Sequence, residues 1–287
     1  MTERNNEDRL VAPHPGQPPF PTNPNIQNTN LQFSVPTEIV DLPSGGKYYP
    51  EGHPLHNKKT LEIKYMTAKE EDILTSQTLI KKGIVFDRLL RSIILEPIDP
   101  NQLLVGDRSA LLIAARITGY GSEYDSRISC PSCGKSAVHT FDLRTSLKTE
   151  YDQSHFSALY PVTATSNGTH IIKLTKTQAE IEVKFLNGND EKRLASIAAS
   201  KKKNNLPDSG ITDMMKACVV SVDGNAERGY VNGFIDTMPL LDARELRKVY
   251  KAITPQNDIK GDFSCANCGH EQELEVPLGA NFFWPDA

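Results

Sequence analysis

Hydrophobic and polar residues alternate over Leu61–Met66, as they do in a strand that is buried on one face. Thr67 and Glu70 follow at the spacing of a capping box, in which each side chain bonds to the backbone N–H of the other residue. Apolar residues then recur at helical spacing until Gly83, a residue that favours a helix end. The pattern predicts a strand over 61–66 and one helix over about 68–82.

Two further helices are predicted before the first cysteines. One covers about 86–95 and ends before Pro97, because the residue that precedes a proline avoids helical geometry. The other starts at Asp107 as its N-cap and runs to about Thr118, where Gly119 ends it.

The second half of the chain repeats this order of elements. The segment IEVKFL at 181–186 matches LEIKYM 120 residues earlier, and it is followed by Asn187 and Asp190 in the two capping positions. Asp242 opens an amphipathic segment 135 residues after Asp107. Because self-similarity at a long offset is typical of repeated structural units, we expect an internal duplication.

Four of the five cysteines form two matching motifs, ISCPSCGK at 128–135 and FSCANCGH at 263–270, again 135 residues apart. Two thiolates separated by two residues can bind one ion from a tight turn, and the following glycine permits the positive φ of that turn. A full set of four thiolates leaves no open position for catalysis. The motifs predict one structural Zn²⁺ per chain, bound by Cys130, Cys133, Cys265 and Cys268.

Other interpretations of these residues stay open at this point. The four cysteines can remain reduced without a metal, and His139 or His270 can replace a thiolate because imidazole is also a zinc ligand. The fifth cysteine, Cys218, lies in an apolar stretch and is expected to be a buried, inert thiol.

These patterns predict an α+β protein whose internally duplicated strand-plus-helices halves are joined through a four-cysteine zinc-ribbon-like site. Six prolines between Val11 and Asn30, with few large apolar residues, predict a disordered N-terminal arm over 1–34. Such an arm either stays free or orders on a neighbouring subunit. The first half covers 35–150 with Cys130 and Cys133, and the second covers 151–287 with Cys265 and Cys268.

Composition narrows the possible partners. The 287 residues are 38% hydrophobic and carry a net charge of −4, which does not favour a polyanion such as nucleic acid. No apolar stretch approaches the roughly 20 residues that span a bilayer, so no membrane partner is expected. The polar start MTERNNEDRL is not typical of a signal peptide, so the chain is expected to stay in the reducing cytoplasm. In that compartment, paired cysteines more often bind metal than form disulfides.

Catalytic motifs are missing from the sequence. It has no phosphate-binding glycine loop, no G-x-S-x-G and no H-E-x-x-H. We therefore expect a protein that is not an enzyme and has no small-molecule substrate.

The chain ends in a cluster of aromatic residues, Phe282, Phe283 and Trp284. Chain termini are usually polar and frayed, so these rings must either dock on the chain's own core or insert into a partner. Since aromatic anchors dominate interface energetics, we treat all three as candidate partner-binding residues.

Several segments together resemble the baseplate hub protein family of T4-like contractile-tailed bacteriophages. They are LPSGGKYYPEGHPL, LEIKYMTAKEEDILTSQTLIKKGIVFDRLLRSII, CPSCG, CANCG and the terminal NFFWP. The resemblance covers about 35–287 and implies a structural or assembly role in the baseplate hub, with other baseplate or tail proteins as partners. It implies a location in the host cytoplasm during assembly and in the virion tail baseplate. The alternative is a nucleic-acid-binding zinc-ribbon protein.

Overall fold

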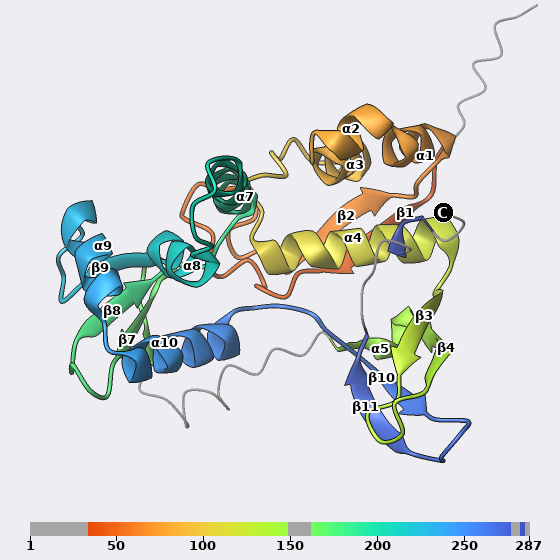
Figure 1. The fold of residues 1–287 in the computed structure, drawn as a ribbon. Helices are drawn as coiled ribbons and strands as arrows, with labels where there is room; N and C mark the ends of the chain where they lie inside the picture. Colours follow the sequence, from red (N-terminus) through yellow and green to blue (C-terminus); the bar gives the residue numbers. More distant parts are fainter. Residues whose placement is uncertain (1–33, 149–161, 277–281, 285–287) are drawn as a thin grey trace, which may run out of the picture. The chain divides into compact units, whose positions relative to one another are not determined.

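A computed structural model describes residues 34–148, 162–276 and 282–284 of the chain. The arm predicted over 1–34 lies outside the described residues, apart from Ser34. All of the elements below belong to the unit formed by 35–287 (Figure 1).

The first elements are an antiparallel hairpin and a capped helix. Strand β1 (Thr37–Asp41) pairs with β2 (Thr60–Lys64), which confirms the predicted strand but ends it two residues before Met66. Helix α1 (Ala68–Thr75) follows the predicted capping box, in which the backbone N–H and the hydroxyl of Thr67 donate to Glu70 Oε2 at 2.9 and 2.6 Å.

The single helix predicted over 68–82 is wrong, because the chain turns at Ser76. The backbone of Ser76 is extended at φ −66° and ψ 102°, and a second helix, α2 (Gln77–Lys81), starts directly after it. The turn leaves the carbonyl of Leu74 to accept a hydrogen bond from Trp284. A contact with a residue near the other end of the chain thus favours two short helices over one.

Helix α3 (Val85–Ile93) agrees with the prediction over 86–95, but the predicted cap of the next helix is wrong. Helix α4 (Val105–Tyr120) starts two residues before Asp107, with Leu104 as its N-cap. The carboxylate of Asp107 is fully buried and accepts bonds from the Ser44 amide and hydroxyl at 3.0 and 2.6 Å, and from the Tyr49 hydroxyl at 2.6 Å. Asp107 therefore binds the loop between β1 and β2 instead of capping its own helix.

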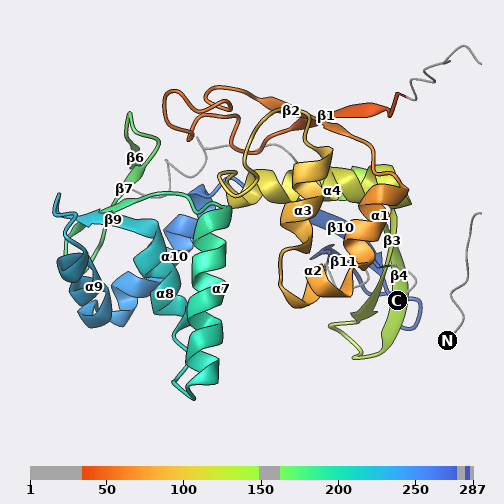
Figure 2. The same ribbon diagram turned by 90° about the horizontal axis from the view of Figure 1, so that it is seen from above.

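The second half contains a four-stranded antiparallel sheet with helices packed beside it (Figure 2). Its strand order is β6-β7-β8-β9. The bounds of these elements are β6 Val162–Ala164, β7 His170–Lys173, β8 Glu180–Val183, α7 Gly188–Lys203, α8 Gly210–Cys218, β9 Val219–Val222, α9 Arg228–Thr237 and α10 Leu240–Ile253.

Two capping predictions in this half have different outcomes. Asn187 caps α7 as predicted, because its Oδ1 accepts from the Asp190 amide at 3.1 Å. Asp242 is not the N-cap of α10, which is Pro239. Like Asp107, it is the fully buried third residue of its helix, and it binds a hairpin loop through the amides of Lys176 and Thr177, each at 2.9 Å.

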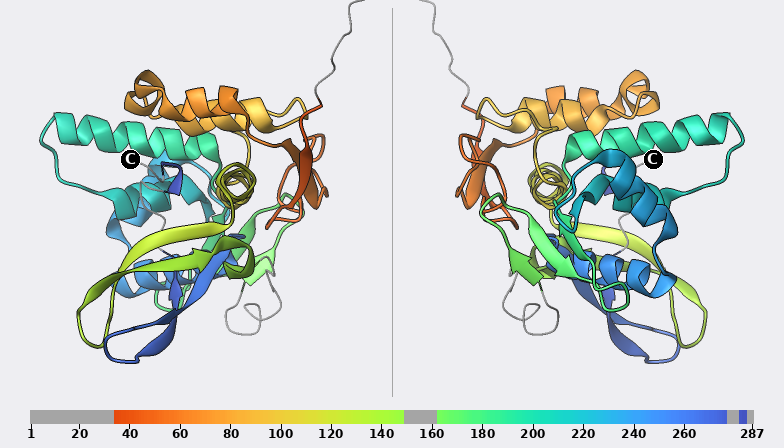
Figure 3. Two further views of the ribbon diagram at one scale, coloured as in Figure 1. Left: turned by 90° about the vertical axis from the view of Figure 1, so that its right-hand side faces the viewer. Right: turned by 90° about the vertical axis from the view of Figure 1, so that its left-hand side faces the viewer.

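Two further hairpins project side by side (Figures 1 and 3). One consists of β3 (Glu123–Ser129) and β4 (Ser136–Asp142), and the other of β10 (Asp258–Ser264) and β11 (Glu271–Glu275). After β4 the chain forms α5 (Leu143–Ser146) and β5 (Leu147–Lys148), and β5 pairs with β10.

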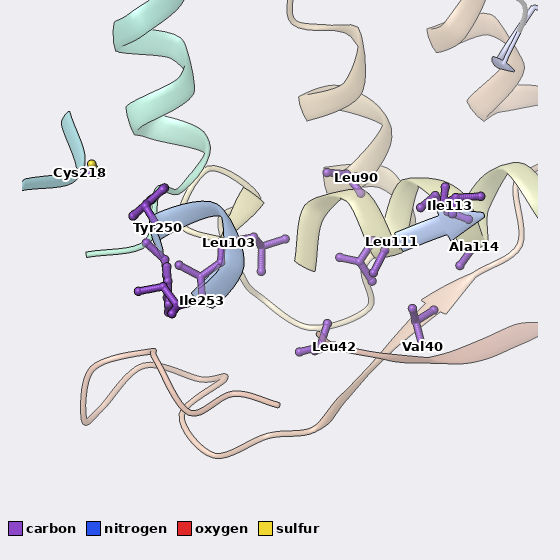
Figure 4. Packing of buried hydrophobic residues seen from close by; sticks show 14 of the residues in the cluster. Val40, Leu42, Leu90, Leu103, Leu111, Ile113, Ala114, Cys218, Tyr250 and Ile253 are labelled. Carbon is purple, nitrogen blue, oxygen red and sulfur yellow. The ribbon is translucent and has the colours of Figure 1, made fainter. Parts of the chain in front are cut away.

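Both halves contribute to one continuous hydrophobic cluster. In the first half of the chain, Leu111 and Ala114 of α4 point toward Val40 and Leu42 (Figure 4). The core thus extends from α4 toward α10, whose Tyr250 and Ile253 are buried in the same cluster.

Candidate metal centre

The tip of the β3–β4 hairpin is a tight turn that we call the first cysteine turn (residues 130–135). The Cys130 amide donates to the Lys135 carbonyl at 2.9 Å, and the Gly134 amide donates to the Cys130 carbonyl at 2.9 Å. Gly134 has φ +71°, which a residue with a side chain rarely adopts. The glycine is therefore part of the geometry that brings Cys130 and Cys133 together.

The second cysteine turn (residues 265–270) repeats these bonds at the tip of the β10–β11 hairpin. The Cys265 amide donates to the His270 carbonyl at 2.9 Å, and the Gly269 amide donates to the Cys265 carbonyl at 2.8 Å. Gly269 has φ +67°. The two motifs thus adopt the same local conformation, as their matching sequences predict.

The two turns place their four sulfurs together, although the turns are far apart in the sequence. Cys130 Sγ lies 3.7 Å from Cys268 Sγ, Cys133 Sγ lies 3.8 Å from Cys265 Sγ, and all four sulfurs are within 4.8 Å of one another. A tetrahedron with Zn–S bonds of about 2.3 Å has edges of about 3.8 Å. The donor set and its spacing therefore fit one tetrahedral metal ion, and none of the four is in a disulfide.

Backbone amides in the turns shift the pKa of individual thiols. A backbone hydrogen bond at Lys135 lowers the pKa of Cys133 to about 6, and backbone bonds at Asn267 and Cys268 lower the pKa of Cys265. The His270 backbone bond also favours the Cys268 thiolate, but partial desolvation and hydrogen bonds with the neighbouring sulfurs raise the pKa of Cys268 to about 11. Four sulfurs this close cannot all carry a charge unless a cation shares the site, since like charges disfavour each other.

The other candidate ligands are bonded elsewhere. His139 Nε2 lies 3.0 Å from the Asp262 carbonyl, and His270 Nε2 lies 2.9 Å from Gln272 Oε1. Cys218 is only 1% exposed at the end of α8, and burial raises its pKa to about 12. The expectation of a buried thiol at Cys218 is confirmed.

Comparison with known protein families shows which family this chain belongs to. The family described as T4 bacteriophage base plate protein matches residues 35–284. The chain belongs to this family. Its members are components of the phage tail baseplate, so this baseplate protein has a structural role in the tail and other tail proteins as partners. No curated protein and no solved structure matches it significantly.

A membrane-crossing helix is not found in the described parts of this baseplate protein: none is both long and apolar enough.

The aromatic residues at the end of the chain pack onto its own core. Phe282 and Phe283 are 6% and 3% exposed, and Trp284 is half-buried beside them. The Phe282 carbonyl accepts a 2.6 Å bond from Arg116 Nε of α4, and the rings of Phe86 and Phe283 lie 5.2 Å apart. Of the two alternatives for these rings, the described residues show the intramolecular contact, and partner binding stays a prediction.

Sequence reasoning missed an ionic network that links α3, α4 and α7. Arg108 of α4 contacts Asp87 at 3.0 Å and Glu191 at 3.5 Å, while Lys192 pairs with the same Asp87. No motif identifies these residues, because they lie on three helices that only the fold brings together.

A second missed feature does have a sequence signal. Lys64 pairs with Glu70 at 2.8 Å, and Lys184 pairs with Asp190 at 2.7 Å. Both lysines precede the capping acid by six residues, so alignment of the two halves at the 120-residue offset would have found the pairs.

Proposed function

We propose that this chain is a structural or assembly component of the baseplate hub, stabilised by zinc and acting through protein–protein contacts rather than catalysis. The observation that carries the proposal is the cluster of four sulfurs, drawn from hairpins in both halves of a baseplate-family chain. A closed site of this kind stabilises a fold, because it has no position left for a substrate.

The proposed zinc ion joins the two cysteine turns. Cys130 and Cys265 are buried and hold the inner side of the site, while Cys133 and Cys268 face the solvent. The bound ion would supply charge neutralisation for four thiolates and a cross-link between segments 35–150 and 151–287. The Lys135 side chain donates to Asn267 Oδ1 at 2.7 Å, so a direct hydrogen bond also links the two turns.

We further propose that the two halves arose by duplication. Three pairs of contacts support it: the capping boxes at Thr67 and Asn187, the lysine–acid pairs beside them, and the buried aspartates in α4 and α10. Strands β3 and β10 also correspond residue for residue at the 135-residue offset. The first half thereby provides a template for interpreting the second.

Three measurements test the function. Native mass spectrometry of the purified chain should find one zinc per chain, and a metal-free protein of full stability would overturn the zinc proposal. Quantitative mass spectrometry of purified virions and of hub intermediates should find the chain in at least one of them. Its absence from both, or salt-dependent DNA binding in a mobility-shift assay, would favour the nucleic-acid alternative over the hub.

A further inference from the structure

Strand β1 has one edge that no described strand covers. The Leu42 amide donates to the Lys59 carbonyl at 2.8 Å, and the Tyr65 amide donates to the Pro36 carbonyl at 2.9 Å, so even-numbered residues of β1 bond toward β2. Because these groups alternate along an antiparallel strand, Thr37, Ile39 and Asp41 direct their N–H and C=O away from β2. Among the described strands, only β2 pairs with β1.

The second half shows what occupies the corresponding edge there. We call the β1–β2 hairpin the first sheet and the sheet of β6 to β9 the second sheet. Ile39 is opposite Glu62 in the first sheet, and Ile171 is opposite Glu182 in the second. The two glutamates are 120 residues apart in the sequence. In the second sheet β6 pairs antiparallel with this edge of β7, and Thr163 is opposite Ile171. The matching edge therefore accommodates an antiparallel strand.

The outer face of the first sheet also exposes apolar side chains. Ile39 is 70% exposed and Leu95, which lies beyond Glu62 on the far side of β2, is 51% exposed. The inner face is different, because Val40 is buried against α4. An uncovered edge beside an exposed isoleucine is a template for pairing with another chain.

The sequence of β1 is complementary to itself in antiparallel register. If Ile39 is opposite Ile39 of a second copy, Thr37 is opposite Asp41 and Glu38 is opposite Val40, so no two like charges meet. We propose that β1 pairs with β1 of a second copy of this chain about Ile39, forming a two-fold symmetric contact. The joined sheet would have four strands, the same number as the sheet of β6 to β9.

The contact is short, since β1 has only five residues. Stable dimers usually bury about 1,200 Å² or more, which a five-residue edge does not reach alone. The pairing is therefore weak and concentration-dependent in solution, and it becomes effective where neighbouring copies are held close together, as in an assembly.

The decisive variant is Ile39→Pro in the full-length, metal-loaded chain. Proline removes an N–H that faces away from β2, so the β1–β2 ladder and the melting temperature should be retained. Sedimentation and light scattering from micromolar to millimolar concentration should show a monomer–dimer equilibrium for the wild type. The association constant should fall by at least roughly tenfold for Ile39→Pro, because two backbone hydrogen bonds across the two-fold axis are lost.

Two further variants keep the test falsifiable. Ile171→Pro, at the edge that β6 covers, should lower the melting temperature but leave self-association unchanged. Ile39→Thr keeps the backbone donor and should weaken the dimer less than proline does. A wild type that stays monomeric at millimolar concentration, or a dimer that Ile39→Pro does not weaken, overturns the proposal. A monomer whose Ile39→Pro variant fails only in baseplate assembly overturns it too, and assigns the edge to a different baseplate protein.

Discussion

The indole Nε1 of Trp284 donates a 3.0 Å hydrogen bond to the carbonyl oxygen of Leu74, 210 residues earlier in the chain. Leu74 is in the last turn of α1, where a helix leaves its carbonyls without intrahelical partners. The aromatic segment 282–284 thereby supplies a hydrogen-bond donor for a carbonyl that the turn at Ser76 leaves unpaired in its helix.

Substitutions at Trp284 therefore test whether the aromatic segment docks on the chain's own core or inserts into a partner. Trp284→Ala should lower the free energy of unfolding by about 3 kcal/mol, as other truncations of packed aromatic residues do. Trp284→Phe keeps most of the ring packing and loses the bond to Leu74, so it should cost about 1 kcal/mol. Chemical denaturation of both variants measures these values. If Trp284→Ala has wild-type stability but cannot join hub intermediates, the aromatic segment instead binds a partner.

The cysteine cluster predicts a contrast between two kinds of thiol. Cys268→Ser should abolish zinc binding and lower the melting temperature sharply, because structural zinc contributes about 10 kcal/mol or more in small zinc domains. Cys218→Ser is the matched control: it lies outside the cluster and should retain one zinc per chain. A chelator should lower the melting temperature of the wild type and of Cys218→Ser, but leave Cys268→Ser unchanged. Equal zinc content in both variants would contradict the assignment.

The buried carboxylate of Glu70 predicts a pH dependence. Burial alone would raise its pKa, but hydrogen bonds from Lys64, Ser92 and Thr67 lower the pKa from 4.5 to about 2. A depressed folded-state pKa stabilises the protein above pH 4.5, and this contribution of about 3 kcal/mol is lost as the pH falls from 4.5 to 2.

Glu70→Gln should therefore be less stable than the wild type at neutral pH, with the difference shrinking as the pH approaches 2. Glu71→Gln, an exposed neighbour in the same helical turn, serves as the control and should leave the acid unfolding profile unchanged. Urea denaturation at a series of pH values measures both. A stability difference that does not change with pH would contradict the role assigned to Glu70.

The ionic network at Arg108 predicts a large effect at one arginine and a small one at another. Arg108→Ala leaves the buried carboxylate of Asp87 with Lys192 as its one remaining ionic partner among the described residues, so it should cost about 2 kcal/mol or more. Arg91→Ala breaks an ion pair with Asp99 whose arginine side chain is 56% exposed, and it should cost less than about 1 kcal/mol. Equal unfolding free energies for the two variants would show that the network contributes no more to stability than an exposed ion pair does.

The sequence alone determined the features that depend on near neighbours in the chain. The capping boxes at Thr67 and Asn187 form between residues three positions apart, so their geometry follows from residue type and spacing. The cysteine turns are local for the same reason, and their common 135-residue offset predicted that two distant pairs would form one cluster.

Tertiary structure decided the features in which a side chain chooses between a local and a distant partner. Asp107 and Asp242 have the residue type of an N-cap, yet each bonds to a loop far away in the sequence. The helix pattern continues through Ser76, but the chain turns there and Trp284 bonds to Leu74. Periodicity and spacing describe a segment in isolation, whereas a buried polar group takes whichever partner the fold brings within hydrogen-bonding distance. Leaving such a group unpaired costs about 1–3 kcal/mol, so it must find a partner. Which partner is within reach depends on the folded chain and cannot be read from the sequence of one segment.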